Sequence, residues 1–261
     1  RLIRARLAHR SMAALTARPH DAAAIAGQFF ANLCRALAAV PPPPSDAGLA
    51  AWFASGKLVP GSFFDWALLD SSLRDGLQQG LVDAAALIFK SSRSRVARPW
   101  AAHFELGRYG SNYLTRALTA YKGLGALASD EAVYAMGDFD AERQPLEGSN
   151  RYALRFGPQD LPPVDAFWSV TLYDADRFLY ANPLDRYSLG DRTPDLQYDP
   201  DGGLTLVLGH LPPADTTNWL PAPQGSFYLI LRMYCPRTEA RTWRIPPVER
   251  LQGVDLTGKM K

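Results

Sequence analysis

The stretch FWSVTLYDADRFLYANPLDRYSLGDR, residues 167–192, leads on to a DPDGG turn at 199–203 and to NWLPAP at 218–223. Apolar and aromatic residues alternate there with polar ones, and tight-turn residues separate the short runs. Such alternation is typical of half-buried β-strands. The stretch therefore predicts β-structure that brings aromatic, arginine and amide side chains close together.

Four strands are predicted in all, and Pro- and Gly-containing turns lie between them. Their ranges are 151–156, 167–173, 204–208 and 226–235. Asp174-Ala175-Asp176 predicts a hairpin turn, and Asp201-Gly202-Gly203 predicts the turn that enters the third strand. Short strands in this arrangement, with no helices between them, favour a β-sandwich or jelly roll over a parallel α/β fold.

The chain before residue 128 predicts helices instead. Ile25, Phe29, Leu33 and Leu37 recur every four residues and would form one apolar stripe, and four prolines at 41–44 end that helix. Further helices are expected through Trp52, over 73–88 and over 112–127. Gly76 and Gly80 suggest close helix contact or a break. The predicted class is α+β, with a helical subdomain at 1–128 and an antiparallel jelly-roll β-sandwich at 129–261.

Composition narrows the range of partners. The 261 residues carry 28 Lys and Arg against 26 Asp and Glu, a net charge of +2, which gives no electrostatic case for nucleic-acid binding. The sequence contains no run of about 18 apolar residues, so a membrane-spanning helix is not predicted. Five arginines precede Asp21, and we expect a solvated basic helix there in preference to a membrane-binding one. The sequence starts without Met, so a removed signal would place the protein in the periplasm, and otherwise it is expected in the cytoplasm.

Arg232 is the charged residue whose position is most informative. In FYLILRMY, residues 227–234, Phe227 and every second residue share one face, while Tyr228, Ile230, Arg232 and Tyr234 share the other. A covered arginine requires an anionic partner. We consider Asp140, Asp174 and Asp191 as structural ion-pair partners, and an anion clamp in a ligand site as the alternative.

Metal and nucleotide sites are not predicted. His9, His20, His103 and His210 show no metal-ligand spacing, and no metal or cofactor is expected. Gly123–Ala128 matches GxGxxA, but it ends a helical pattern instead of following a strand.

Several motifs together resemble one family. GSFFD at 61–65, YGSNYLTRA at 109–117, AVYAMGDFD at 132–140 and NWLPAPQGSFYLILRMYCP at 218–236 are similar to the bacterial domain of unknown function family 1214. The resemblance runs from about Leu49 to Arg250. It implies a helical subdomain joined to a jelly roll, often next to a domain of family 1254, and it supplies no established catalytic residues.

The first functional hypothesis is a small-molecule site between helical cap and jelly roll. Metal-free acid–base chemistry on a carbonyl or carboxylate compound is compatible with it, and whether the protein is an enzyme is left open. The catalytic candidates are Tyr187, Asp191 and Arg232, and the ligand-binding candidates are Tyr134, Trp168, Arg186, Asn218, Trp219, Tyr228 and Tyr234. The alternative is a non-catalytic assembly module, such as a homo-oligomer, with an aromatic core. An ion pair between Arg232 and a single carboxylate would favour the assembly module.

Overall fold

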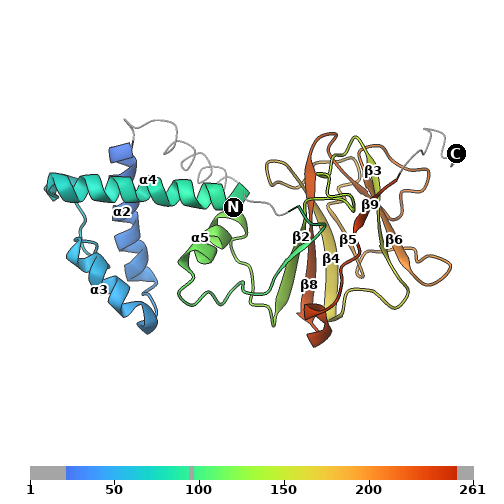
Figure 1. Cartoon of the computed structure of the whole chain (residues 1–261), viewed down its shortest axis with the longest axis horizontal. Helices are drawn as coiled ribbons and strands as arrows, with labels where there is room; N and C mark the ends of the chain where they lie inside the picture. The colour runs from blue at the N-terminus through green and yellow to red at the C-terminus, as the bar shows by residue number, and fades with distance from the viewer. Residues whose placement is uncertain (1–21, 94–96, 252–261) are drawn as a thin grey trace. The chain divides into compact units, whose positions relative to one another are not determined.

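The computed structural model describes residues 22–93 and 97–251 (Figure 1). Its contacts divide the chain between Ser94 and Arg95 into two compact units. The sequence placed the division after residue 128, but residues 101–103 form a strand that pairs with the sheet of the second unit. The predicted basic helix before Asp21, with His9 and His20, lies outside the described residues.

The first unit consists of helices around a small apolar core. They are α2 (Ala22–Ala39), α3 (Ala47–Ser55) and α4 (Ser71–Arg93), with single turns η2 (Pro44–Asp46) and η3 (Trp66–Leu68). Because proline lacks an amide donor, the run at 41–44 ends α2 as expected. The core residues are Ala26, Phe30, Cys34, Leu58, Phe64 and Leu69.

The buried stripe of α2 is shifted by one residue from the prediction. Ala26, Phe30 and Cys34 are buried, whereas Phe29 is 44% exposed. The Phe30 ring stacks on Trp66 at 6.4 Å between centroids and packs beside Phe64 at 6.1 Å. The aromatic residues beyond the helix therefore determine which face of α2 is covered, and an i+4 pattern cannot show where they will lie.

The two glycines of α4 have neither of the roles predicted for them. The helix continues unbroken from Ser71 to Arg93. A Cβ atom at Gly76 or at Gly80 would meet nothing within 4 Å. Both positions therefore lie on an open surface of the helix.

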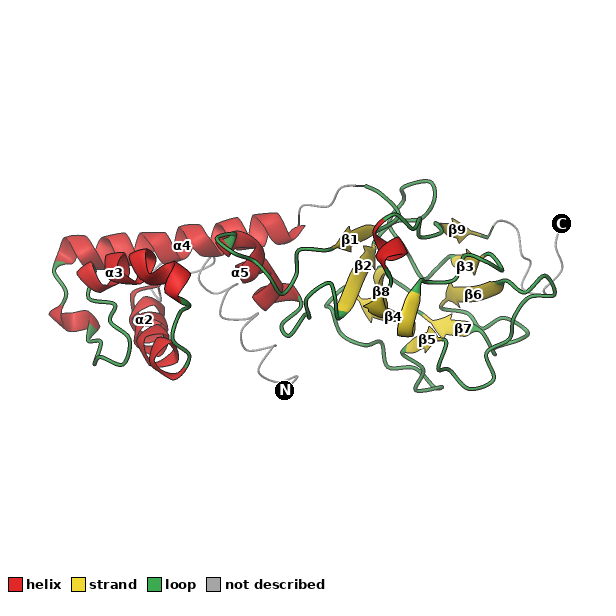
Figure 2. Ribbon diagram, turned by 90° about the horizontal axis from the view of Figure 1, so that it is seen from below, coloured by secondary structure: helices red, strands yellow, loops and turns green. Residues whose placement is uncertain are grey.

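The second unit is built on two β-sheets (Figure 2). The five-stranded sheet has the order β1-β2-β8-β4-β5, and the four-stranded sheet has the order β7-β6-β3-β9. Helix α5 (Tyr113–Lys122) and turn η4 (Thr238–Arg241) complete the unit. The strands are β1 (Ala101–His103), β2 (Ala132–Gly137), β3 (Arg151–Phe156), β4 (Val164–Asp174), β5 (Ser188–Gly190), β6 (Leu204–Gly209), β7 (Trp219–Pro221), β8 (Phe227–Pro236) and β9 (Val248–Arg250).

The predicted strands are confirmed as β3, β4, β6 and β8, and the α+β class is confirmed with them. The strands that the sequence did not predict are β2 and four three-residue strands, β1, β5, β7 and β9. Three residues are too few to show alternation. Strand β7 pairs with β6 in parallel, so the smaller sheet is mixed and not purely antiparallel.

One apolar core lies between the two sheets. Alternate residues of β8, namely Phe227, Leu229, Leu231 and Met233, are at most 3% exposed, as predicted. They belong to the same cluster as Tyr152, Leu154 and Phe156 of β3. The other side chains of β8 therefore lie on the face of the five-stranded sheet away from the core, which we call the outer face.

Strand β5 approaches β4 so closely that only glycine fits at its end. A Cβ atom at Gly190 would lie 2.2 Å from the Trp168 carbonyl oxygen.

Helix α5 begins at a cap, because the Asn112 side chain accepts a hydrogen bond from the Thr115 amide at 3.1 Å. It ends at Lys122, before Gly123, and is shorter than the predicted helix over 112–127. Among the described residues no helix has the length and apolar character that crossing a lipid bilayer requires.

Candidate functional site

Strand pairing places Arg232 in the middle of the outer face. Tyr134 of β2 lies on one side of it in register, and Ser169 of β4 lies on the other. His103 of β1 is the register partner of Tyr134, so one row across the sheet reads His103, Tyr134, Arg232, Ser169. Residues directly opposite each other on antiparallel strands have Cβ atoms about 5 Å apart, so neighbours in this row can share a ligand.

The guanidinium of Arg232 bonds to hydroxyl groups, not to carboxylates. Nη1 donates to Thr171 Oγ1 at 2.8 Å, and Nη2 donates to the Tyr173 hydroxyl at 2.7 Å. Among the described residues, no ion pair involves Arg232, so the predicted partners Asp140, Asp174 and Asp191 do not neutralise it. A half-buried positive charge with only neutral partners retains its attraction for an anion.

Stacked aromatic rings lie beside Arg232. Tyr173 and Tyr228 stack at 5.4 Å between centroids, and Phe167 and Tyr234 stack at 4.2 Å. Burial raises the pKa of Tyr228, so this hydroxyl is neutral at physiological pH. Aromatic rings therefore lie next to hydrogen-bonding groups at a few fixed points, a combination that small-molecule sites use.

A second arginine lies near the same tyrosine pair. Arg177 follows the turn after β4, and its guanidinium lies 5.1 Å from the centre of the Tyr121 ring of α5. Its positive charge acts on Tyr228, as do the charges of Asp138 and Asp174. We call Thr171, Tyr173, Arg177, Tyr228 and Arg232 the outer-face cluster. The sequence did not identify Thr171 or Tyr173, because only strand register shows that they approach Arg232, nor Arg177, which the turn after β4 places near them.

Tyr134 and His103 complete the row. The Tyr134 hydroxyl accepts a hydrogen bond from the Leu127 amide at 3.3 Å. Burial lowers the pKa of His103; Glu105 opposes that shift, while Arg98 and Lys122 add to it. A histidine with a lowered pKa is neutral at pH 7 and can accept a proton. From the sequence, His103 was considered only as a metal ligand. Its position in the row beside Tyr134 and Arg232 was not predicted.

Four predicted site residues serve to hold the chain in place. Arg186 Nη1 donates to the carbonyl oxygens of Thr217 at 3.1 Å and Trp219 at 2.9 Å, and also to that of Thr216. The indole of Trp219 is buried and donates to the Gly209 carbonyl at 3.0 Å. Trp168 is 3% exposed and packs on Phe156 in the core.

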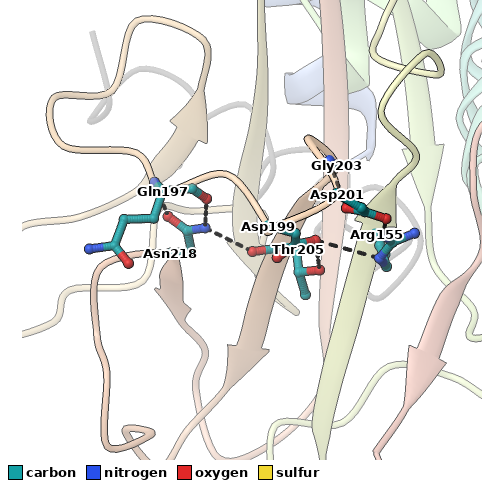
Figure 3. A network of polar contacts seen from close by, with 7 residues as sticks. All are labelled: Arg155, Gln197, Asp199, Asp201, Gly203, Thr205 and Asn218. Atoms are coloured by element: carbon teal, nitrogen blue, oxygen red, sulfur yellow. Dashed lines mark hydrogen bonds and ion pairs between the residues drawn. The ribbon is translucent and has the colours of Figure 1, made fainter.

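Asn218 joins a loop to the smaller sheet (Figure 3). Its amide oxygen accepts from the Gln197 amide at 3.0 Å, and its amide nitrogen donates to the carbonyls of Gln197 at 2.6 Å and Thr205 at 3.0 Å. Thr205 in turn donates to Asp199, which pairs with Arg155. With its amide oxygen and nitrogen bonded to backbone groups, Asn218 is committed to holding this loop.

The two remaining catalytic candidates have side-chain partners other than Arg232. The Tyr187 hydroxyl donates to Asp185 at 3.1 Å, and this hydrogen bond raises the pKa of Tyr187. Asp191 accepts a hydrogen bond from the Trp168 amide at 3.0 Å. Asp191 and Trp168 both line an open groove of about 430 Å³, together with Tyr198, prolines of the β3–β4 loop and Arg237. Arg237 pairs with Asp165, so the positive charge of Arg237 at that groove is already balanced.

No group of three or more His, Cys, Asp or Glu side chains among the described residues is arranged to hold a metal ion. His210 is bonded through Nδ1 to the Ala222 carbonyl at 3.0 Å. Cys34 and Cys235 are both free thiols, the first buried and the second exposed.

The second unit is thus a two-sheet α+β structure with a polar cluster on the outer face of its larger sheet. Residues 131–238 match the family described as "Protein of unknown function (DUF1214)", and this segment of the chain belongs to that family. The match covers β2 to β8 and therefore includes Arg232 and its partners.

Two solved structures are similar to this chain. The VPA0106 protein from Vibrio parahaemolyticus is 28% identical, with a TM-score of 0.54, over 80% of this chain and 51% of that one. An uncharacterized protein from Burkholderia cenocepacia is 16% identical over 74% of this chain and 44% of that one, with a TM-score of 0.35. This chain spans about half the length of each. No curated protein matches it.

Proposed function

We propose that the second unit binds a small molecule through an anionic or carbonyl oxygen that meets Arg232 on the outer face. The observation that carries the proposal is the bonding of Arg232. Its partners, Thr171 and Tyr173, are neutral hydroxyls, and among the described residues no carboxylate forms an ion pair with it. Hydroxyl groups hydrogen-bond a half-buried guanidinium without neutralising its charge, so Arg232 still attracts an anion.

The proposal includes acid–base chemistry at the row around Arg232. Arg232 would stabilise an oxyanion or enolate, and His103 and Tyr134 would carry the proton. We assign the proton to them because the pKa of Tyr187 is raised, which disfavours it as a base, and because Asp191 is bonded to a backbone amide. The jelly-roll assignment is part of the same proposal; two sheets around one core support it, while the parallel β6–β7 pair departs from it.

Native mass spectrometry of the purified protein, followed by denaturing extraction, tests this function. We expect a discrete small molecule in the wild-type protein that is lost in Arg232→Gln. Removing one charge-assisted hydrogen-bonding group should weaken binding roughly ten- to hundredfold. Arg155→Gln is the matched control, because Arg155 pairs with Asp199 and Asp201 on the smaller sheet, and it should retain the ligand.

The alternative function, an assembly module, has one observation in its favour. The first unit exposes large apolar side chains: Trp52 is 69% exposed, Phe63 is 88% and Leu68 is 81%. Exposed apolar groups of this size often mark contact with another protein. In the same mass spectra, the wild-type protein could be a multimer without ligand, and Arg232→Gln could leave that multimer unchanged. This result would support the assembly module and count against the ligand site.

A further inference from the structure

Two buried side-chain atoms of the second unit, Arg177 Nη1 and Asp140 Oδ2, have no hydrogen-bond partner among the described residues, and Arg177 Nη1 is the cationic one. Buried polar nitrogens almost always have a partner, and an unpaired cationic one costs more than a neutral one. An atom in this state is complete only when an acceptor reaches it.

The backbone at Arg177 is also in a conformation that its side chain does not favour. Its φ is 69°, in the left-handed region that suits glycine or asparagine. The turn is fixed on both sides, because the Arg177 amide donates to the Asp174 carbonyl at 3.0 Å and the Phe178 amide donates to the Asp174 carboxylate at 2.9 Å. These two hydrogen bonds hold Arg177 in this conformation and fix the point from which its side chain extends.

The turn keeps Arg177 close to Tyr173, the hydroxyl partner of Arg232, because the Arg177 amide is bonded to the carbonyl of Asp174, the residue after Tyr173. The guanidinium of Arg177 lies over Tyr121, and that of Arg232 lies 5.7 Å from the centre of the Tyr173 ring, which stacks on Tyr228. Both arginines therefore belong to the same end of β4. Asp138 and Asp174 also act on Tyr228, yet among the described residues the ion pairs include neither arginine.

We propose that the ligand has two acidic groups, one bound by Arg232 and the other by Arg177, as in a small dicarboxylate. The inference rests on the proposed function and adds to it a second anion-binding residue and a substrate class. A dianion that reaches both arginines would give Nη1 of Arg177 an acceptor and Arg232 an anionic partner. A monocarboxylate can satisfy only one of them.

Calorimetric titration at low salt with malonate, succinate and glutarate, each against the monocarboxylate of equal carbon number, tests the inference. We expect at least one dicarboxylate to bind the full chain about tenfold or more tightly than its monocarboxylate. Arg177→Asn should abolish this preference and leave monocarboxylate binding unchanged, since asparagine accepts a left-handed φ. Arg177→Lys should keep part of the preference, and Arg232→Gln should weaken binding of both series.

Arg143→Asn is the matched control, because Arg143 also has a left-handed φ, of 63°, but lies exposed in another turn. It should bind both series as the wild type does. A preference for dicarboxylates that survives in Arg177→Asn, or equal binding of both series, would overturn the role of Arg177 alone. Absence of binding of both series to the folded wild-type protein, or binding that Arg232→Gln leaves intact, would overturn the Arg232 site as well.

Discussion

At the scale of single residues, Arg232 differs from the arginines of the second unit that are paired with carboxylates. Arg155 is tied to Asp199 and Asp201, and Arg237 is tied to Asp165. Arg232 has hydroxyl partners, and among the described residues Nη1 of Arg177 has none. The guanidinium of Arg232 on the outer face is thus left without a carboxylate partner among the described residues, which is the property that an anion site requires.

His103 provides a pH-dependent prediction at this scale. Its folded-state pKa is lowered, mainly by burial, so the unfolded chain binds the proton more tightly. Stability that is present above the unfolded value, about 6.5, should therefore be lost as pH falls through the folded-state pKa. Urea unfolding between pH 7.5 and 5, compared with His103→Gln, measures this contribution. Equal slopes of unfolding free energy against pH in the two proteins would contradict it.

Among the elements, strand β8 agrees most closely with its sequence. Its alternation predicts which residues enter the core and which lie on the outer face, and the structure confirms both sets. What alternation cannot predict is the neighbour across the sheet. Thr171 and Tyr173 reach Arg232 because β4 pairs with β8 with Thr171 opposite Ile230 and Tyr173 opposite Tyr228.

Helix α4 supports a stability prediction at the same scale. Gly76 and Gly80 lie in an unbroken helix, and a Cβ atom at either position would meet nothing. Gly76→Ala and Gly80→Ala should each stabilise the first unit by up to about 1 kcal/mol, because alanine has the higher helix propensity. Gly27→Ala in α2 is the contrasting variant, since its Cβ atom would lie 3.2 Å from that of Trp66. Thermal unfolding of the three variants tests this, and a loss of stability in both α4 variants would count against it.

For the whole molecule, the central feature is that each unit has a core of its own. The second core depends on the segment before residue 129. Trp100 packs on Gly137, its indole donates to the Pro246 carbonyl at 2.7 Å, and β1 extends the larger sheet. The structural unit therefore begins earlier than the segment of the chain that is rich in strands.

Two fragments test that division. Residues 97–251 should unfold cooperatively, because they contain both sheets and the core between them. Residues 129–251 lack β1, α5 and Trp100 and should be less stable by about 2–4 kcal/mol, the scale of losing a large packed aromatic residue. Urea unfolding of the two fragments measures this difference in stability. Equal stability would instead support a boundary near residue 128.

The sequence by itself determined the α+β class, the helices α2 to α5, four of the strands and the two faces of β8. These features depend on local periodicity and on turn and proline chemistry, which are properties of neighbouring residues. The short strands, the face of α2, the partners of Arg232 and the approach of Arg177 were decided by tertiary structure alone. They depend on which residues meet across strands or helices, and a contact between distant parts of the chain leaves no periodic signal in the sequence.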